Sequence, residues 1–481
     1  MNTVEKIRHL QGLQGSNAKL AFLQENRDDE NLRQLLSLTY EPTISYYLTP
    51  DKKAKTGVTP DADVSVLLTE MRNTLGERVK TGGAAKAYYQ ELLGRTDDAG
   101  RFLIDAVLNR DIKAGIAETT INKVWPGLVT QIPYMRCTLP AVAKVQSWPW
   151  QAALPETSPA EGFFAYSQVK ADGMYANVNV EGERVTITSR NGSVFLSGVW
   201  SQAVARQAIA AATAITKDYS PNYQFHGEML VKKDGKVLPR KDGNGIMNSI
   251  LSEGEMPDGG YEVVFVCWDA IPLGVAVSGG RWATPYQVRF TGLQKAVDAL
   301  QSTAFTTVES RPVYTWKDAV DHFVEVTLRG EEGTILKRWD AQWMDGDSRE
   351  QVKMKVSFQV DLKIVGFNPG DPNGKHAVTF GSLQCETDEL GTTVVPLAVG
   401  VSGMSDKMRK EISDNRDNYT GKVVTVESNA VIMARDGTYS LFLPRLIEVR
   451  NDKLLADNLA HVKAQFEAAM AGKAVLKAKA K

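Results

Sequence analysis

The stretch FFAYSQVKADG, residues 163–173, decides how the middle of this chain folds. Residues 163–169 have the apolar and aromatic composition of a β-strand, and residues 174–180 read as a second strand with polar residues interspersed. The Asp-Gly pair between them is a signal for a tight turn. We therefore expect Lys170 at the end of a strand, beside a turn and held by rigid backbone.

A lysine in this position can act as a nucleophile if its ammonium group loses a proton. Burial and neighbouring cations both favour the neutral amine, because they disfavour the charged form. The same residues, Lys170 to Gly173, would also suit a surface lysine beside an ordinary hairpin turn. The tetrapeptide leaves both interpretations open, so the choice between them depends on the rest of the chain.

The composition is that of a globular protein with more than one core. The chain has 481 residues, 43% hydrophobic and 23% charged, with a formal net charge of −1. This balance excludes a uniformly basic nucleic-acid binder, although a local basic groove remains possible. The three cysteines have no metal-ligand spacing, which favours a reducing compartment. Without an apolar signal region or a membrane-length apolar stretch, we expect a cytoplasmic protein.

The secondary-structure signals change along the chain and predict a multidomain protein. Residues 1–130 show helical spacing of apolar residues and predict an all-α domain. Residues 131–360 alternate strands with helices and predict an α+β domain. Residues 361–455 are rich in strand signals and suit a small antiparallel β-barrel of the oligonucleotide-binding type, the OB-fold. Residues 456–481 return to a helical pattern with a lysine-rich tail.

The α+β domain carries polar residues on or beside apolar strands, where charges are costly unless they are paired or exposed. Singly, Lys353 and Lys355 could protect an edge strand and Glu332 could cap a turn. Together, a nucleophilic lysine, further cations and two carboxylates suit transfer of a phosphate-linked group with Mg²⁺. Phe265 would offer a face to a purine base. The set comprises Gln168, Lys170, Arg190, Glu228, Glu332, Lys337, Lys353 and Lys355.

Short motifs in a fixed order resemble those of the covalent nucleotidyltransferases, the superfamily of polynucleotide ligases and mRNA capping enzymes. Lys170 to Gly173 resembles motif I, and residues 189–192 (SRNG) resemble the ribose- and phosphate-contacting element after it. So many motifs in the family's order disfavour the surface-lysine interpretation. Five further segments resemble the remaining motifs in order: residues 226–228 resemble motif III, Phe265 with Trp268 and Asp269 motif IIIa, residues 332–337 motif IV, residues 353–355 motif V and residues 450–453 motif VI.

Within that superfamily the chain resembles ATP-dependent DNA ligases of the T-even bacteriophage type. The end of the helical domain, residues 121–128 (INKVWPGL), closely resembles the end of their DNA-binding domain. Residues 360–366 (VDLKIVG) and 441–444 (LFLP) also favour these ligases over capping enzymes and RNA ligases. The resemblance covers nearly the whole chain, apart from the lysine-rich tail after about Gly472.

The resemblance implies ATP and Mg²⁺ as cofactors and nicked double-stranded DNA as the partner of a monomeric protein. Lys170 would attack the α-phosphate of ATP and form lysyl-AMP. The AMP would pass to the 5′-phosphate of the nick, and the neighbouring 3′-hydroxyl would then displace it. Glu228 and Glu332 would hold the metal. The implied nucleotide contacts are Gln168, Arg190, Glu228, Phe265, Lys337, Lys353, Lys355, Arg450 and Lys453.

Two positions depart from the family's motifs. Motif I usually has an arginine where this chain has Tyr175, so we expect a weakened or re-routed contact to the nucleotide. Motif III usually begins with aspartate where this chain has His226, which we expect to be a hydrogen-bond partner of Glu228 rather than a metal ligand. We also expect residues 240–245 to form a loop that approaches the nick phosphates.

Two alternatives remain at this point. The chain could be an RNA ligase or capping-type nucleotidyltransferase on the same catalytic fold, which nucleotide choice and sealing of a nicked duplex would distinguish. It could also be a nucleic-acid-binding scaffold with a decayed site, given Tyr175 and His226. A scaffold would not become covalently labelled by ATP.

Overall fold

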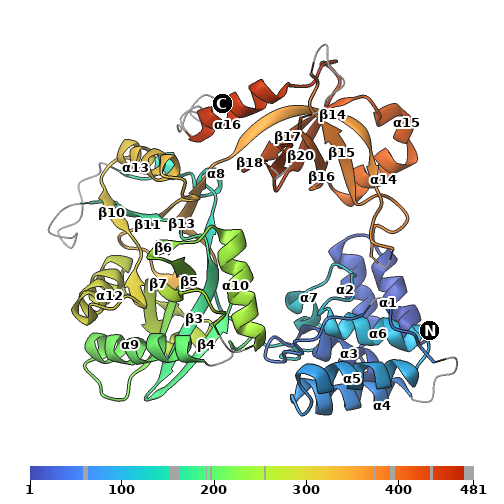
Figure 1. Cartoon of the computed structure of the whole chain (residues 1–481), viewed down its shortest axis with the longest axis horizontal. Helices are drawn as coiled ribbons and strands as arrows, with labels where there is room; N and C mark the ends of the chain where they lie inside the picture. Colours follow the sequence, from blue (N-terminus) through green and yellow to red (C-terminus); the bar gives the residue numbers. More distant parts are fainter. Residues whose placement is uncertain are drawn as a thin grey trace.

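The computed structural model describes residues 1–470 apart from 52, 58–62, 151–162, 191, 196–197, 254–255, 373, 390–395 and 434–436. Three groups of elements follow one another along the chain, coloured blue, green to yellow, and orange to red in Figure 1. We call them the helical region, the middle region and the carboxyl-terminal region. None of the helices in the described part of the chain is both long and apolar enough to span a membrane. The lysine-rich tail lies outside the described residues.

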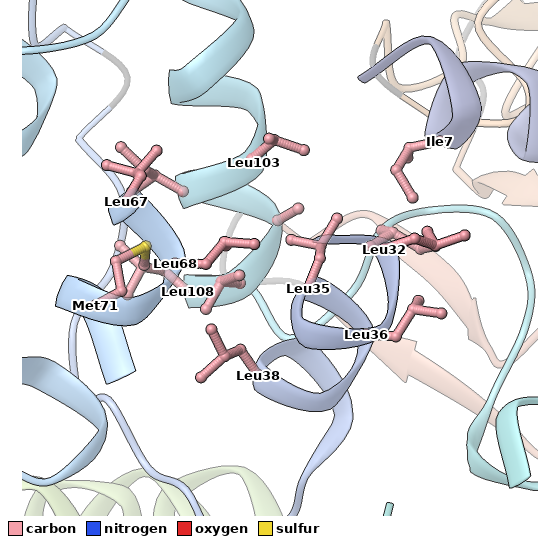
Figure 2. Close-up of a cluster of buried hydrophobic side chains, with 14 of the residues drawn as sticks. Ile7, Leu32, Leu35, Leu36, Leu38, Leu67, Leu68, Met71, Leu103 and Leu108 are labelled. Atoms are coloured by element: carbon pink, nitrogen blue, oxygen red, sulfur yellow. The ribbon is translucent and has the colours of Figure 1, made fainter. Parts of the chain in front are cut away.

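The helical region is built around leucines at helical spacing. In α3, Leu32, Leu35, Leu36 and Leu38 are buried, and the side chain of Asp29 caps the first turn by accepting from Leu32 N–H. Figure 2 shows these leucines packed with side chains from α1, α4 and α6. The elements are α1 Thr3–Gly12, α2 Ser16–Glu25, α3 Glu30–Tyr40, α4 Val64–Met71, the π-helix η1 Arg72–Gly76, α5 Gly82–Gly94, α6 Asp98–Leu108 and α7 Glu118–Asn122.

The middle region contains two larger β-sheets that share no strand. The first has the order β1-β13-β11-β2-β10, with β1 parallel to β13 and the other pairs antiparallel. Its strands are β1 Met135–Thr138, β2 Ala165–Val169, β10 Ser310–Val313, β11 Gly333–Arg338 and β13 Gly346–Lys355. The second has the order β4-β3-β5-β7-β9 with β6 paired to β5. Its strands are β3 Met174–Glu181, β4 Arg184–Ser189, β5 Asn222–Lys233, β6 Lys236–Val237, β7 Tyr261–Pro272 and β9 Phe305–Thr307.

Residues 170–173 carry the chain from one sheet to the other. β2 pairs with β10 and β11, whereas β3 pairs with β4 and β5, so the Asp-Gly pair does not close a hairpin between β2 and β3. The hairpin interpretation of this stretch is therefore wrong, because both strands find their partners elsewhere in the sequence. Lys170 lies at the junction of the two sheets.

Helices cover the outer faces of the two sheets. α9 and α12 pack together and against the second sheet, and α13 packs against the first. A further two-stranded sheet pairs β8 Arg281–Trp282 with β12 Trp343–Met344. The helices are α8 Pro140–Ala143, the 3₁₀-helix η2 Val145–Ser147, α9 Val199–Thr216, α10 Arg240–Glu253, α11 Leu273–Ser278, α12 Tyr286–Leu300 and α13 Trp316–Leu328.

The carboxyl-terminal region is organised around an antiparallel sheet of order β16-β15-β14-β17-β20. β14 begins at Phe358, before the boundary expected at residue 361, and α14 and α15 are helices that the strand signals did not predict. The ring of Phe466 in α16 lies 5.3 Å from that of Phe358, so the last helix packs on the first strand. The elements are β14 Phe358–Asn368, β15 Ser382–Glu386, β16 Ala398–Val401, α14 Asp406–Asp414, α15 Arg416–Tyr419, β17 Val423–Ser428, β18 Ala430–Met433, β19 Tyr439–Phe442, β20 Arg445–Arg450 and α16 Leu459–Met470.

Candidate active site

Lys170 follows the last residue of β2 and faces the carboxylate of Glu332, the residue immediately before the neighbouring strand β11. Its backbone N–H donates to the Gly333 carbonyl at 2.8 Å, and its Nζ forms an ion pair with Glu332. Gly333 has φ +141°, and a Cβ there would collide with the Met354 carbonyl, so only glycine fits. This close packing of β11 against β13 fixes Glu332 beside the lysine.

Glu228, on β5, approaches the same lysine from the second sheet. Its carboxylate accepts from the Gly173 N–H at 2.6 Å. Burial raises the pKa of Glu228 to about 7; the Gly173 hydrogen bond and Lys170 oppose this rise, and the Glu332 charge adds to it. A Cβ at Gly173 would collide with the Met229 carbonyl, which explains why glycine ends this crossing segment. Two carboxylates, one from each sheet, therefore flank Lys170.

A cavity of about 530 Å³ opens beside Lys170 between the two sheets. Of the predicted site residues, Gln168, Lys170, Arg190, Glu228, Lys337 and Lys353 line it. Trp268, Arg240, Asn244 and Ile335 also line it; they lie in stretches that the sequence analysis quoted, but it gave none of them a contact in this cavity. Sequence reasoning missed Tyr134, Arg136 and Val308, which lie outside the quoted motifs.

The inner wall of the cavity combines an amide, a cation and an aromatic ring, with the buried phenol of Tyr286 behind them. Gln168, 1% exposed, donates from Nε2 to Ser310 Oγ at 3.0 Å and accepts from the Tyr286 hydroxyl at 3.0 Å. Burial lowers the pKa of Lys337 to about 8, and its Nζ donates to the Tyr286 hydroxyl at 3.2 Å. The Trp268 ring lies 5.8 Å from the same Nζ. Such a wall can stack a flat heteroaromatic base and hydrogen-bond its edge.

Phe265 does not face this cavity, so its assignment as the base-stacking residue is wrong. Its side chain is fully buried on the other face of β7, where its ring lies 5.2 Å from that of Phe305. Successive side chains of a strand point to opposite faces. Trp268 lies three positions further along and therefore reaches the face that Phe265 does not. The sequence carries no signal that separates them, because residues 265–268 are all apolar, and only the structure shows the alternation of buried and partly exposed positions.

The two lysines of motif V differ in their surroundings. Lys353 lines the cavity, but Lys355 lines an adjoining cleft and donates to Asn429 Oδ1 at 3.2 Å in the carboxyl-terminal region. Arg190 lies at the mouth of the cavity with its guanidinium 4.5 Å from the centre of the Tyr134 ring. The structure thus brings Lys353 and Arg190 to Lys170 and directs Lys355 toward the neighbouring region.

Arg450 and Lys453 are held away from the cavity by Asp361. Asp361 Oδ2 accepts from Arg450 at 3.0 Å and from Lys453 at 2.7 Å, while its Oδ1 accepts from Thr425 at 2.6 Å. Hydrogen bonds from Lys453 and Thr425 and the charges of both cations keep the pKa of Asp361 low, although burial opposes this. Among the described residues that line the cavity, neither cation of motif VI is found.

The two departures from the family's motifs contact each other. The Tyr175 hydroxyl donates to Asn177 Oδ1 at 2.7 Å and lies 3.0 Å from His226 Nδ1, which must then donate to it. Burial lowers the pKa of His226 to about 4, so the ring is neutral at neutral pH. The expectation that His226 bonds to Glu228 is wrong, because β3 places Tyr175 next to it. Two charged side chains of the family pattern are replaced here by a neutral phenol–imidazole pair.

Residues 240–245 begin helix α10 and do not form the expected loop. Arg240 donates to Asp172 at 2.8 Å, and both residues line the cavity. The segment contains glycines at 243 and 245, whose helix propensity is low, but the packing of α10 on β5 outweighs it.

The carboxylates around Lys170 fit a magnesium ion that binds together with a phosphate substrate. Among the residues that the structure describes, no group of three or more His, Cys, Asp or Glu forms a closed metal cage. Mg²⁺ commonly binds through one or two carboxylates and completes its shell with water and phosphate oxygens. Glu228 and Glu332 supply that number, and the raised pKa of Glu228 indicates a site where added positive charge is favourable.

Comparison with known proteins gives consistent matches. Residues 152–355 match the family model described as "ATP dependent DNA ligase domain". The chain is 27% identical to the DNA ligase of Enterobacteria phage T4, over 96% of this chain and 98% of that protein. It is 26% identical to the DNA ligase of Enterobacteria phage T6 over the same shares. The solved structure named Pmar-Lig_PreS3 has a TM-score of 0.63 and 20% identity, covering 94% of this chain and 99% of that one, which shows a shared fold.

Proposed function

We infer that this chain is an ATP-dependent DNA ligase similar to those of the T-even bacteriophages, as the motifs indicate and the matches to the T4 and T6 ligases confirm. The main support for this function is the position of Lys170. It lies between two carboxylates at the edge of a cavity whose wall, with Gln168 and Trp268, suits a nucleotide base. The cavity brings a nucleophile, cations and an aromatic ring into one space.

In the first step ATP is the substrate. Its adenine would stack on Trp268 and hydrogen-bond to Gln168, and its α-phosphate would lie at Lys170 Nζ. The attack forms the N–P bond of lysyl-AMP and breaks the bond to pyrophosphate. Glu332 contacts Nζ and would orient the amine for the attack, and the proton that the amine loses would pass to water.

In the same step, the cations would neutralise the phosphate charge and the carboxylates would bind the metal ion. Lys337 and Lys353 line the cavity and would neutralise the α-phosphate while disfavouring the ammonium form of Lys170. Glu228 and Glu332 would hold Mg²⁺. When bound, this ion supplies further neutralisation of the phosphate charge.

The nicked duplex would enter after lysyl-AMP has formed. The 5′-phosphate would take the AMP, and the 3′-hydroxyl would then attack the activated phosphate, release AMP and seal the strand. We propose that residues 1–130 are a DNA-binding domain, residues 131–360 the adenylation domain and residues 361–455 an OB-fold domain, followed by a helix and tail at residues 456–481. Support for the OB-fold comes from the five-stranded antiparallel sheet of the carboxyl-terminal region. We propose that the protein acts as a monomer.

Covalent labelling tests this function directly. The protein would be incubated with α-labelled ATP and Mg²⁺, and sealing of a nicked duplex would be followed on a denaturing gel. Lys170→Ala should lose both labelling and sealing. Lys410→Ala is the control, because Lys410 is exposed and ion-paired with Asp414 on α14. Persistent labelling of Lys170→Ala would refute the assignment.

The same assay separates the alternatives. Labelling by GTP, or sealing restricted to RNA strands, would indicate a capping-type enzyme or an RNA ligase. A wild-type protein that binds duplex DNA but takes up no label would indicate a scaffold.

A further inference from the structure

The mouth of the cavity lacks the cation that motif I usually provides. β3 carries no lysine or arginine, and Tyr175 stands where the family pattern has arginine. The Tyr175 hydroxyl is engaged by Asn177 and His226, and its ring packs edge-on against Tyr134 at 4.8 Å. A phosphate at this wall of the cavity therefore has no charged partner on β3.

Arg136 lies at the same mouth but comes from another strand. It belongs to β1, at one edge of the first sheet, and its side chain is 45% exposed. It lines the cavity of Lys170 and also an adjoining cleft of about 880 Å³ that reaches Arg110 and Thr119 of the helical region. Its guanidinium thus faces both the space for a nucleotide and the space between the two regions.

Among the described residues, the Arg136 guanidinium is paired with the Asp347 carboxylate, and this ion pair is weak. Arg136 Nε donates to Asp347 Oδ1 at 2.8 Å, but the Asp347 side chain is 70% exposed. Exposed ion pairs contribute little, because water screens the charges and both side chains lose freedom. Guanidinium groups bind phosphates through paired, charge-assisted hydrogen bonds. A phosphate group at the mouth can therefore displace the Asp347 carboxylate from the Arg136 guanidinium.

We propose that Arg136 binds a phosphate group at the mouth of the cavity and supplies the contact that Tyr175 cannot make. This role rests on the proposed ligase function. The phosphate belongs either to the bound nucleotide or to the 5′ end of the nick, because Arg136 faces both spaces. Arg190 and Arg240 are already engaged at the mouth, by the Tyr134 ring and by Asp172.

The test compares Arg136→Ala with a matched variant, Arg311→Ala. Arg311 lies on β10 at the opposite edge of the same sheet, is 44% exposed and is ion-paired with Glu325. Two reactions would be measured for each: labelling by α-labelled ATP at increasing ATP concentration, and sealing of a nick supplied already adenylated. Loss of a charge-assisted contact predicts a change of about tenfold or more in one of them.

The two reactions identify the phosphate. A rise of about tenfold in the ATP concentration for half-maximal labelling assigns Arg136 to the nucleotide. An equal fall in sealing of the adenylated nick assigns it to the DNA. Arg311→Ala should change neither. Arg136→Lys should lose less than Arg136→Ala, because it keeps the charge but not the planar fork.

Asp347→Ala separates phosphate binding from a structural role. If Arg136 only ties β1 to β13, removal of either partner should lower the unfolding temperature and both activities alike. If Arg136 binds phosphate, Asp347→Ala keeps wild-type activity. Two results would overturn the inference and leave the ligase function standing. In one, Arg136→Ala labels and seals as well as Arg311→Ala does. In the other, Asp347→Ala loses as much activity as Arg136→Ala does. A wild-type protein that takes up no label would overturn both.

Discussion

Replacing Asp361 by asparagine should speed the formation of lysyl-AMP. Asp361 holds Lys453 and Arg450, the cations that motif VI is expected to bring to the β- and γ-phosphates of ATP. They cannot contact pyrophosphate while they remain on this carboxylate, which is 11% exposed and lies in β14. Because Asp361 belongs to the same region as the two cations, closure of that region alone does not free them, and contact with the nucleotide requires that these ion pairs break.

The size of the effect follows from the Lys453 contact. Its hydrogen bond to Asp361 is charge-assisted at 2.7 Å, but the Lys453 side chain is 34% exposed. A charged hydrogen bond contributes about 1.5–3 kcal/mol, and the partial exposure places this one near the lower limit. Asparagine keeps the shape and the bond from Thr425 but loses the charge. We therefore expect Asp361→Asn to raise the single-turnover rate of labelling by about tenfold.

Asp452→Asn is the control for this experiment. Asp452 also accepts from Arg450, at 2.8 Å, and the substitution changes the net charge equally, but Asp452 is 70% exposed and does not contact Lys453 through any described hydrogen bond. Its labelling rate should stay close to that of the wild type. The companion variants Arg450→Ala and Lys453→Ala should slow labelling far more than sealing of an adenylated nick. Labelling by Asp361→Asn no faster than by Asp452→Asn would refute the idea that Asp361 restrains the two cations.

Three further predictions follow from the described contacts. Trp268→Ala should raise the ATP concentration needed for labelling without changing the unfolding temperature much, whereas Phe265→Ala should destabilise the fold by about 3–5 kcal/mol, as calorimetry and ATP titration of both variants would show. Burial raises the pKa of Glu228 from 4.5 to about 7, so the folded protein gains stability from the protonated carboxyl group. This contribution to the free energy of unfolding is complete below pH 4.5 and is lost as the pH rises through about 7. Glu228→Gln should remove this pH-dependent decline, as denaturant titrations at several pH values would show. A chain without residues 1–130 should still form lysyl-AMP but seal nicks poorly, most of all at high salt, and unchanged nick affinity would contradict this.

The position of Lys170 could be predicted from local sequence because the signals that set it are local. A run of strand-forming residues ends at Val169, and the glycine at 173 is required where the chain crosses close to the Met229 carbonyl. The carboxylates Glu228 and Glu332 could be predicted because the motif order names them. No local pattern, however, shows that β2 and β3 belong to different sheets, since that depends on which distant strands they pair with.

The errors at Phe265 and His226 have different physical origins. Phe265 was assigned from its type and its neighbours in the motif, but a strand sends adjacent side chains to opposite faces, so Trp268 reaches the cavity and Phe265 stays in the core. His226 and Glu228 lie two positions apart on β5, but the pairing of β5 with β3 places Tyr175 beside His226 and gives the imidazole another partner.

From the sequence alone one could infer the ligase function, the place of Lys170 at the end of a strand and the order of helical, mixed and β-rich regions, because motif spacing and hydrophobic periodicity are local properties of the chain. Tertiary structure alone decided that Tyr175 and His226 bond to each other, that Arg136 reaches the mouth of the cavity, and that Asp361 holds the cations of motif VI. The hydrogen bonds join residues that lie 51 to 92 positions apart, and Arg136 lies on a different sheet from Tyr175. Strand pairing and packing bring such residues together, and neither can be read from the spacing of residues along one segment.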